Sequence, residues 1–419
     1  MDDARLSAPS VRPVAAVPPV AAAAPVAMLT HSYYEEDPRV RREAETLAAA
    51  GHPVDVFALR QPGDEPVGEI DGVRVVRLDV QRHQGAGLGT YLLEYARFFV
   101  TAGLALARAH ARRHYRLVQV HSPPDILVFA ALPVRVRGVP VLLDLHEAMP
   151  EFFRMRFPRA AHPIVQAALR LQERLAVGFA AHALTVNDAL VARLVHLGVR
   201  PERVTRVRNT PSLARFDPAL VPGRSFMADG ALRLVYTGAL TPTYEMDVAI
   251  RAVASLARTR PSLRIDFAIF GRGDAEKGLR ALVDELGVGD RVSFAGRIPL
   301  ADVPAAVAAA DIGIAPTRRD PFTEMSLSTK ILEYAAMGRP AICSDLPMVA
   351  VSFGSDAVWT YPSGDHEALA MAVLDIVDDP SARGRRVERA TATVAAMAWE
   401  REAATYRDVV DRLIAGRRG

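Results

Sequence analysis

The sequence contains a single cysteine, Cys343, among its 419 residues. One cysteine cannot form an intramolecular disulfide, and it excludes a zinc or iron–sulfur site built from cysteines. The chain also has no run of about 18 uncharged apolar residues, which a membrane-spanning helix would need. Its first residues, Met1-Asp2-Asp3, lack the cationic start of a secretory signal. These absences predict a cytoplasmic protein of a reducing compartment.

Lysine is nearly absent as well, because Lys277 and Lys330 are the only two lysines in a chain otherwise rich in arginine. Lysine and arginine together exceed the acidic residues only over residues 1–210, by 26 against 21. A nucleic-acid-binding protein usually has a dense basic patch with interleaved aromatic side chains, which is not visible here. We therefore expect no nucleic-acid partner, and we consider small acidic substrates or an anionic membrane surface instead.

The length of the chain predicts two or three domains, at roughly 150 residues for each. Hydrophobic residues make up 50% of the chain and charged residues 24%, which is typical of a folded α/β protein. Residues 1–25 are mostly Ala, Pro and Val and include five prolines, so we predict a disordered tail there.

From residue 26 onward, short apolar runs alternate with longer amphipathic stretches. This alternation is typical of a parallel sheet with helices on both faces. We predict an α/β protein of two doubly wound Rossmann-like domains, over residues 26–210 and 211–393, joined at a proline-rich segment. The carboxyl ends of the two sheets would face one cleft. We expect a C-terminal helix within residues 394–419 to cross back to the first domain.

One segment carries both a start and a stop signal for a helix, with Ser328-Thr329-Lys330 at its start and Gly338 at its end. The free backbone N–H groups of Leu327, Ser328 and Thr329 would face a bound anion, and the helix dipole favours negative charge there. The pattern therefore predicts a phosphate-binding helix start.

Within this helix, Lys330 and Glu333 stand three residues apart and project from one side. The helix would thus present a cation and a carboxylate together. A surface salt bridge between the two side chains is the simpler alternative. We favour ligand binding because the helix start is rich in hydroxyl groups.

The segment from Glu324 to Gly338 resembles the nucleotide-sugar signature of family 4 retaining glycosyltransferases, which have the GT-B fold. In that signature a Glu-x7-Glu pair precedes an Ala-x-Gly-x-Pro helix end, and Glu333 matches the second glutamate. The resemblance implies that the Glu333 carboxylate holds the ribose hydroxyls of a nucleotide. The first glutamate would fall at Met325, so we assign its catalytic role at the sugar to the neighbouring Glu324.

The helix start Ser328-Thr329-Lys330 resembles that of a subgroup of this family with a Ser/Pro-Thr-Lys pattern. The resemblance implies that the lysine supplies positive charge to the diphosphate. Gly238 begins a loop that resembles the Gly-Arg-Leu loop of the family, but Ala239 replaces the arginine and Tyr244 stands where a lysine is usual. Two cations of the family are therefore missing. We expect Lys330 and Arg272 to stabilise the leaving diphosphate instead.

Two further segments follow predicted strands of the second domain. Gly271 and Arg272 lie in a Gly-Arg-Gly turn, for which a strand-end turn with positive φ is the alternative explanation. Arg297 and Ile298 stand where the backbone meets the nucleobase in the family.

Two histidines lie at predicted strand ends in the first domain. His146 follows the strand Val139–Leu145 and matches a family histidine that contacts the donor sugar, so we assign it to sugar positioning. His121 also lies at a strand end, and we rank it second. A structural role is the usual one for an isolated histidine, but the strand ends face the expected cleft.

The first helix of the first domain resembles a subgroup with the pattern Asp-x-Arg-Val-x-Arg. Arg39 or Arg42 could therefore meet a phosphate of the donor or acceptor, or could lie on a solvated helix turn. Asn209 falls where the Pro-Asn-Gly turn of the family leads into the second domain, and an Asx turn is its alternative role.

A predicted helix over Leu92–Ala109 combines an aromatic, apolar body with a basic end. Such a surface fits an anionic membrane or a lipid-linked acceptor. The alternative is that its apolar side packs on the sheet, as most helices of α/β domains do.

The resemblance implies a glycosyltransferase that moves a sugar from a nucleotide diphosphate sugar to an acceptor hydroxyl with retention of configuration. The acceptor could be a carbohydrate, a lipid-linked sugar or a small molecule. No cofactor or metal is expected, because no cluster of carboxylates or histidines has ligand spacing. We expect a cytoplasmic enzyme, with peripheral contact at the inner membrane face as an option. A non-catalytic nucleotide-sugar-binding subunit and an epimerase of the same fold are the alternatives.

Overall fold

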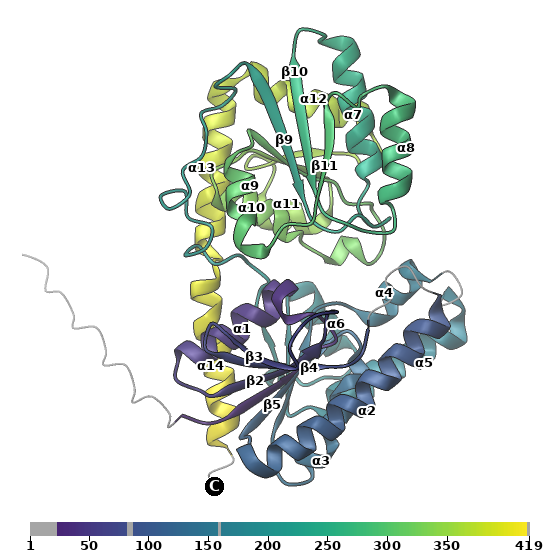
Figure 1. Ribbon diagram of the computed structural model, residues 1–419, viewed down its shortest axis with the longest axis vertical. Helices are drawn as coiled ribbons and strands as arrows, with labels where there is room; N and C mark the ends of the chain where they lie inside the picture. Colours follow the sequence, from purple (N-terminus) through teal and green to yellow (C-terminus); the bar gives the residue numbers. More distant parts are fainter. Residues whose placement is uncertain (1–22, 82–86, 158–160, 417–419) are drawn as a thin grey trace, which may run out of the picture.

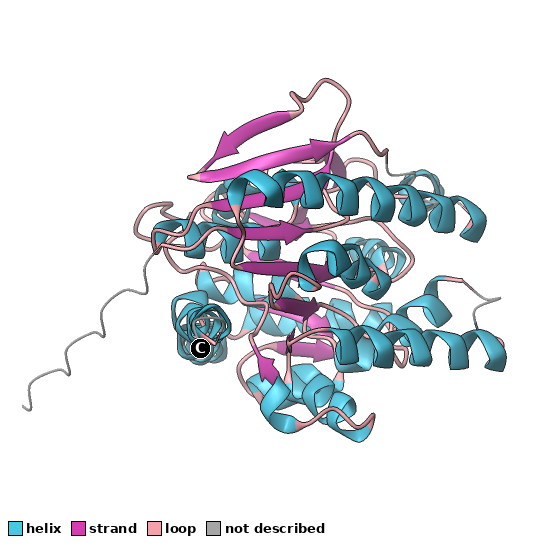
Figure 2. Cartoon of the chain, turned by 90° about the horizontal axis from the view of Figure 1, so that it is seen from below, coloured by secondary structure: helices cyan, strands magenta, loops and turns pink. Residues whose placement is uncertain are grey.

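The computed structural model describes residues 23–81, 87–157 and 161–416. Within these ranges the chain forms two α/β domains, one above the other in Figure 1. Figure 2 looks at the molecule from below and shows strands of the lower domain between helices on both sides. The tail predicted over residues 1–25 lies outside the described residues apart from its last three.

The first domain is built on a sheet of eight strands in the order β3-β4-β2-β1-β5-β6-β7-β8. The strands are β1 (Val26–Leu29), β2 (Val54–Leu59), β3 (Val67–Ile70), β4 (Val73–Leu78), β5 (Leu117–Ser122), β6 (Val141–Leu145), β7 (His182–Thr185) and β8 (Val204–Arg206). All pairs are parallel except that of β3 with β4, an antiparallel edge pair that the sequence pattern does not predict.

The helices of the first domain cover both faces of this sheet. They are α1 (Pro38–Ala49), α2 (Leu88–Arg113), α3 (Leu132–Arg135), α4 (Met149–Arg156), α5 (Pro163–Phe179) and α6 (Asp188–His196), with the 3-10 helices η1 (Tyr34–Glu36), η2 (Asp125–Ala131) and η4 (Pro201–Arg203). Ala27 and Leu29 of β1 lie in the core that also contains residues of α2, η2 and α5. Val26 and Met28 lie in the core on the other side, with residues of α1. Because successive strand residues point to opposite faces, both faces of β1 are buried, and its apolar run is continuous.

Several helices begin where the sequence supplies an acidic cap. The Asp37 carboxylate accepts hydrogen bonds from the backbone N–H groups of Arg39 and Val40, both at 3.2 Å, and a proline occupies the first turn of α1. Asp379 accepts from the backbone N–H of Ala382 at 2.8 Å in the same way and starts α13 (Pro380–Ala396).

The second domain has a fully parallel sheet of six strands in the order β11-β10-β9-β12-β13-β14. Its strands are β9 (Ala231–Thr237), β10 (Arg264–Phe270), β11 (Val292–Gly296), β12 (Ile312–Ala315), β13 (Ala341–Ser344) and β14 (Trp359–Tyr361). Its helices are α7 (Met246–Thr259), α8 (Glu276–Leu286), α9 (Val303–Ala308), α10 (Thr329–Ala336), α11 (Pro347–Phe353) and α12 (His366–Asp378), with the 3-10 helices η5 (Leu300–Asp302) and η6 (Thr323–Met325).

The C-terminal segment forms two helices, α13 and α14 (Trp399–Ala415), that run down one side of the molecule from the second domain to the first (Figure 1). The helix predicted within residues 394–419 is therefore correct only for α14, because residues 394–396 belong to α13. The Trp399 indole donates a hydrogen bond to Thr46 Oγ1 at 3.0 Å, and the buried Tyr406 hydroxyl donates to Gln119 Oε1 at 2.6 Å. These bonds fix α14 to α1 and β5 of the first domain.

The helix predicted over Leu92–Ala109 is longer in the structure, where α2 spans Leu88–Arg113. Its buried residues Phe98 and Leu106 pack in the core of the sheet. Within the described ranges, no helix has the length and apolar character needed to cross a membrane.

Candidate active site

Two adjoining cavities lie between the domains. The larger has a volume of about 1020 Å³ and is lined by residues of both domains, among them Arg42 and Glu333. The smaller, of about 650 Å³, is lined by His146 of the first domain and by the start of α10. Thr243, Thr329 and Lys330 line both cavities, so the two form one continuous cleft.

The start of α10 opens into this cleft, as the sequence predicts. Ser328 is the N-cap residue, but its hydroxyl makes no cap bond, and its Oγ is buried without a partner among the described residues. Leu327, Ser328 and Thr329 all line the smaller cavity. Because the first N–H groups of a helix lack partners within the helix, this start can take an anion.

The side chains of Lys330 and Glu333, both on α10, reach the cleft, as a ligand-binding site requires. Lys330 is 7% exposed and lines both cavities, and Glu333 lines the larger one. The described ion pairs include none between Lys330 and Glu333, so the surface salt bridge considered above is wrong. Instead, the Lys330 ammonium lies 3.9 Å from the centroid of the Tyr244 ring.

Burial changes the ionisation of the Glu333 carboxyl. Desolvation raises its pKa to about 7, and the positive charges of Lys330 and Arg42 oppose this rise. A carboxyl group with this pKa is partly ionised at neutral pH. As a carboxylate it offers only acceptors, which suits it to a pair of hydroxyl groups.

Two glycines allow the loops after β9 and β10 to approach each other. The Gly238 N–H donates to the carbonyl of Phe270 at 2.8 Å, and a Cβ on Gly271 would lie 1.8 Å from the carbonyl oxygen of Gly238. The φ of Gly271 is outside the left-handed region, so the strand-end turn with positive φ is not the reason for this glycine. Close backbone contact is the reason.

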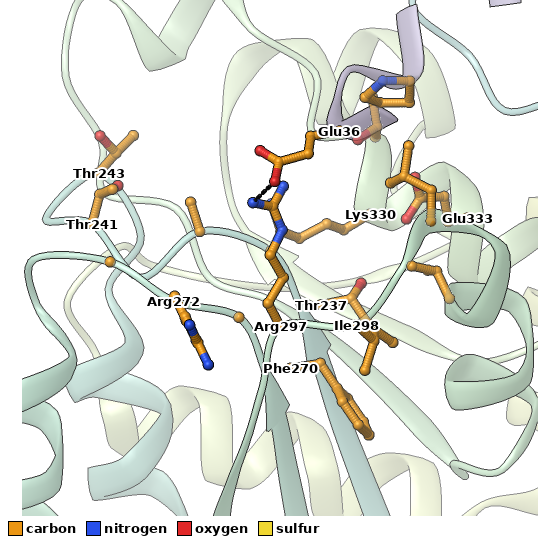
Figure 3. Close-up of a pocket in the computed structure, with 18 of the residues that line it drawn as sticks. Glu36, Thr237, Thr241, Thr243, Phe270, Arg272, Arg297, Ile298, Lys330 and Glu333 are labelled. Carbon is orange, nitrogen blue, oxygen red and sulfur yellow. Dashed lines mark ion pairs between the residues drawn. The ribbon is translucent and has the colours of Figure 1, made fainter. Parts of the chain in front are cut away.

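The predicted arginines of the second domain differ in their partners. Arg272 is exposed at the cleft wall and has no ion pair with a described carboxylate. Arg297 lines the cleft beside Ile298 and forms an ion pair with Glu36 of the first domain. Figure 3 shows this pair as a dashed line, with Lys330 and Glu333 to one side of it.

On the first-domain side, Asp144 gathers two histidines and an arginine. His146 Nε2 lies 2.9 Å from Asp144 Oδ2, and His121 Nδ1 lies 3.2 Å from the same oxygen. His146 faces the smaller cavity, but His121 is 1% exposed and lines neither cavity. His121 therefore supports His146 from behind and does not itself face the cleft.

His121, Asp144 and His146 are also the one group among the described residues whose ligand atoms could surround a metal ion, since these atoms lie within 4.8 Å of one another. The Arg39 guanidinium already binds Asp144, with Nη2 2.7 Å from Oδ1. Its fixed positive charge disfavours a second cation at the same carboxylate. The group fits a histidine-positioning role better than a metal site.

The structure separates Arg39 from Arg42. Arg39 is 2% exposed and binds Asp144, so the phosphate contact proposed for it is wrong, because its guanidinium is already used inside the domain. Arg42 lines the larger cavity and donates to the Asn209 side-chain oxygen. Asn209 lines the smaller cavity, and its side chain accepts from Arg42 instead of closing an Asx turn.

Glu324 does not reach the cleft. Its carboxylate accepts from Arg319 Nε at 2.9 Å, is 41% exposed and lines neither cavity. The catalytic role assigned to it from the offset motif is therefore wrong, because the 3-10 helix η6 turns it to solvent. The neighbouring Met325 carbonyl instead accepts from Asn187 Nδ2 of the first domain at 2.7 Å.

Sequence reasoning missed Asn187, which lines the smaller cavity and bridges the two domains. Its backbone position follows β7, and its side chain caps α6 by accepting from the N–H of Leu190 at 2.9 Å. A helix-capping asparagine directly after a strand was the available signal.

Comparison with known proteins gives matches in both domains. Residues 37–210 match the family described as "Glycosyl transferase 4-like domain", and residues 231–379 match "Glycosyl transferases group 1". Glycogen synthase of Mycobacterium tuberculosis is 26% identical over 360 residues, which cover 82% of each chain. D-inositol 3-phosphate glycosyltransferase of Kineococcus radiotolerans is 28% identical over 399 residues, which cover 89% of each chain.

Solved structures show the same fold. Sucrose-phosphate synthase from Thermosynechococcus elongatus superposes with a TM-score of 0.75 at 19% identity, over 94% of this chain and 100% of that one. Anabaena HepE in complex with UDP-glucose gives a TM-score of 0.67 at 15% identity, over 93% of this chain and 100% of that one. The two Rossmann-like domains, with a cleft between them, therefore have the GT-B arrangement. The chain belongs to the group 1 glycosyltransferases with a glycosyl transferase 4-like domain, and it is a glycosyltransferase.

Proposed function

We propose that this glycosyltransferase takes its sugar from a nucleotide diphosphate sugar bound in the cleft and transfers it to an acceptor hydroxyl with retention of configuration. The observation that carries the proposal is the arrangement on α10. One short helix presents a helix start and a lysine that have no carboxylate partner among the described residues, together with a partly buried carboxyl group, all lining one cleft.

Each part of the donor has a complementary group. The Glu333 carboxylate accepts from the ribose hydroxyls, while the N–H groups at Ser328 and Thr329, with Lys330 and Arg272, meet the diphosphate. The nucleobase lies against the backbone of Arg297 and Ile298. The sugar then reaches the smaller cavity, which His146 of the first domain and Lys330 of the second both line.

Catalysis in such a site depends on orientation and on stabilising the departing diphosphate, because its negative charge develops in the transition state. Lys330 and the α10 start provide that stabilisation without a metal ion, so we propose that transfer needs neither metal nor cofactor. The names of the solved neighbours support the donor class, since Anabaena HepE was captured with UDP-glucose.

A donor screen by thermal unfolding tests the proposal. UDP-glucose is the first ligand, followed by the corresponding GDP-, dTDP- and ADP-sugars. A ligand present at 100 times its dissociation constant should add about 2.7 kcal/mol to the free energy of unfolding. We expect a base-selective shift that Glu333→Ala and Lys330→Ala abolish.

The matched control is Lys277→Ala, because Lys277 is the other lysine, is exposed on α8 and lines neither cavity. It should keep the shift. No shift with any donor, from protein that unfolds cooperatively, would contradict a nucleotide-sugar site. Sugar transfer that requires added metal after chelation would contradict the metal-free part.

We also propose that the acceptor lies at an anionic membrane surface, which the first domain contacts peripherally from the inner face. Leu93 of α2 is 72% exposed and Ile164 of α5 is 73% exposed, and both helices pack against η2 on one face of the sheet. The acidic residues of these helices, Glu94 and Glu173, are both buried. The outer surface is thus apolar and arginine-bearing, as a surface that meets anionic lipid would be.

Cosedimentation with vesicles tests this contact. The protein should bind vesicles that contain anionic phosphatidylglycerol more than zwitterionic phosphatidylcholine vesicles, and Leu93→Ser with Ile164→Ser should weaken binding. Val351→Ser is the control, because Val351 is equally exposed, at 77%, but lies in the second domain. Equal binding by all variants and both vesicle types would contradict the proposal.

A further inference from the structure

The Lys330 side chain ends between two aromatic rings of the second domain. Its Nζ lies 3.9 Å from the centroid of the Tyr244 ring and 5.4 Å from that of the Tyr236 ring. The two rings are themselves 6.0 Å apart and inclined at 64°, so they form two walls of a corner. An ammonium group at these distances is attracted by the negative face of each ring.

Other cations of the cleft are neutralised differently. Arg297 pairs with Glu36, and Arg156 pairs with Asp274 at 3.3 Å. Lys330 forms no ion pair with any carboxylate of the described residues, although only 7% of its surface is exposed to solvent. A ligand anion that binds Arg297 must compete with an internal carboxylate, but one that binds Lys330 displaces no carboxylate of the described residues.

The loop after β9 is shaped to hold this lysine. A Cβ on Gly238 would lie 2.3 Å from Lys330 Cε and 2.8 Å from Nζ, so a side chain at this position would displace the end of the lysine. The Tyr236 hydroxyl is fixed by donating to the carbonyl of Ala239 at 2.6 Å. The backbone N–H of Tyr244 closes a turn by donating to the carbonyl of Thr241 at 3.0 Å.

We infer that Tyr244 is a positioning residue for Lys330: its ring holds the ammonium, without neutralising it, at the place where a diphosphate anion enters the cleft. Tyr236 and Gly238 complete the corner, and Tyr244 supplies the nearer face. The identity of the anion rests on the proposed function, whereas the corner itself does not. An anion that reaches this point receives a cation that is already oriented, so less conformational entropy is lost on binding.

The chain is well suited to a direct test, because it contains only two lysines. Reductive methylation of the intact protein with 13C-formaldehyde labels Lys277, Lys330 and the terminal amine while keeping each positive charge. Lys277→Arg and Lys330→Arg each remove one signal and so assign both lysines. We expect the Lys330 methyl signal of the ligand-free protein to lie upfield of the Lys277 signal, because aromatic faces shield it.

Two variants separate the ring from its hydroxyl group. Tyr244→Leu should move the Lys330 signal toward the Lys277 position and raise the dissociation constant for UDP by about 2- to 30-fold, the range from an exposed to a desolvated cation–π contact. Tyr244→Phe, which keeps the ring, should restore both the upfield signal and most of the affinity. A change that came only from damaged packing would not restore the ring-current shift in this way.

Titration with UDP completes the experiment. UDP should move the Lys330 signal in wild-type protein, because the charge of the diphosphate comes to lie beside the ammonium while the Tyr244 ring still holds it. An unshifted Lys330 signal in the ligand-free protein would overturn the corner whatever the ligand. UDP binding, seen by thermal unfolding, without movement of that signal would overturn the positioning role and leave the proposed function standing. An upfield signal with no binding of any nucleotide would overturn the proposed function, and the positioning role with it.

Discussion

The guanidinium of Arg39 and the carboxylate of Asp144 form a two-pronged ion pair inside the first domain, with Nε 2.8 Å from Oδ2 and Nη2 2.7 Å from Oδ1. Both side chains are almost fully buried. His146 Nε2 also lies 2.9 Å from Asp144 Oδ2. The ion pair therefore fixes the carboxylate that orients the cleft-facing histidine. The Arg39 charge holds the pKa of the Asp144 carboxyl well below its usual range against the effect of burial.

Replacement of Asp144 by asparagine should destabilise the protein strongly. It removes the two-pronged partner of the buried Arg39 charge and leaves only Glu43, whose Oε1 lies 3.2 Å from Nη2, so it should lower the free energy of unfolding by about 3–5 kcal/mol. Urea denaturation measures the change. Asp188→Asn is the control, because it breaks an exposed pair with Arg206 and should cost at most about 1 kcal/mol. Equal losses in the two variants would contradict the account of the buried pair.

Affinity for a nucleotide diphosphate sugar should depend on pH through Glu333. Its pKa is raised to about 7 by burial, and only the carboxylate accepts from two ribose hydroxyls. The affinity for UDP-glucose should therefore fall by about tenfold between pH 8 and pH 6, as calorimetry at each pH would show. Glu333→Gln should bind weakly at both pH values. A pH-independent wild-type affinity would contradict the role of the carboxylate.

The same group should affect stability with the opposite dependence on pH. Because its folded-state pKa is raised above the unfolded value, Glu333 contributes stability below about pH 4.5 that is lost as pH rises through about 7. The free energy of unfolding of the wild type, minus that of Glu333→Gln, should therefore decrease over this window. An increase would show that the carboxylate is stabilised in the folded protein and not desolvated.

Alanine at Gly271 should disrupt the cleft wall. The added Cβ would lie 1.8 Å from the Gly238 carbonyl oxygen, and backbone must move to relieve the contact. We expect a loss of about 3 kcal/mol in the free energy of unfolding and loss of nucleotide binding. Gly278→Ala is the control, because it lies in α8 with open space around it and should stabilise the helix by up to about 1 kcal/mol. A stable, nucleotide-binding Gly271→Ala protein would contradict the close contact.

Two ion pairs across the cleft should favour the closed arrangement of the domains. Arg297 pairs with Glu36, and Arg156 pairs with Asp274 at 3.3 Å. The double variant Glu36→Gln, Asp274→Asn should have a larger radius of gyration in small-angle X-ray scattering at low salt. High salt should produce the same change in the wild type, because partly exposed pairs are screened. A radius unaffected by either change would show that other contacts, such as that of Asn187 with the Met325 carbonyl, hold the domains.

Particular residues show where sequence reasoning succeeded. The helix start at Ser328 and the pair Lys330 and Glu333 were placed correctly in the cleft, because N-terminal caps and spacing within one helix are local properties. The parallel sheets were predicted for the same reason, since apolar runs buried on both faces appear directly in the sequence. The fold class and the helix that lines the cleft could therefore be predicted from the sequence alone.

Other residues could not be placed in this way. Arg39 and Arg42 are three residues apart on α1, yet one lies inside the domain on Asp144 and the other lines the cleft. Glu324 stands one residue from its expected place in the motif, and the turn of η6 directs it to solvent. In both cases the direction of a side chain depends on segments more than 100 residues away or on a turn that spacing does not reveal.

The sequence by itself determined two Rossmann-like domains, the hydroxyl-rich start of the helix at Ser328 and a scarcity of lysine that makes Lys330 conspicuous. These features follow from short-range periodicity, capping and composition, which need no knowledge of distant partners. Only the tertiary structure decided which cations are paired with a carboxylate inside the protein and which are not. Arg39 is neutralised by Asp144, whereas Lys330 rests on the Tyr244 ring, because long-range packing brings each cation to a different neighbour.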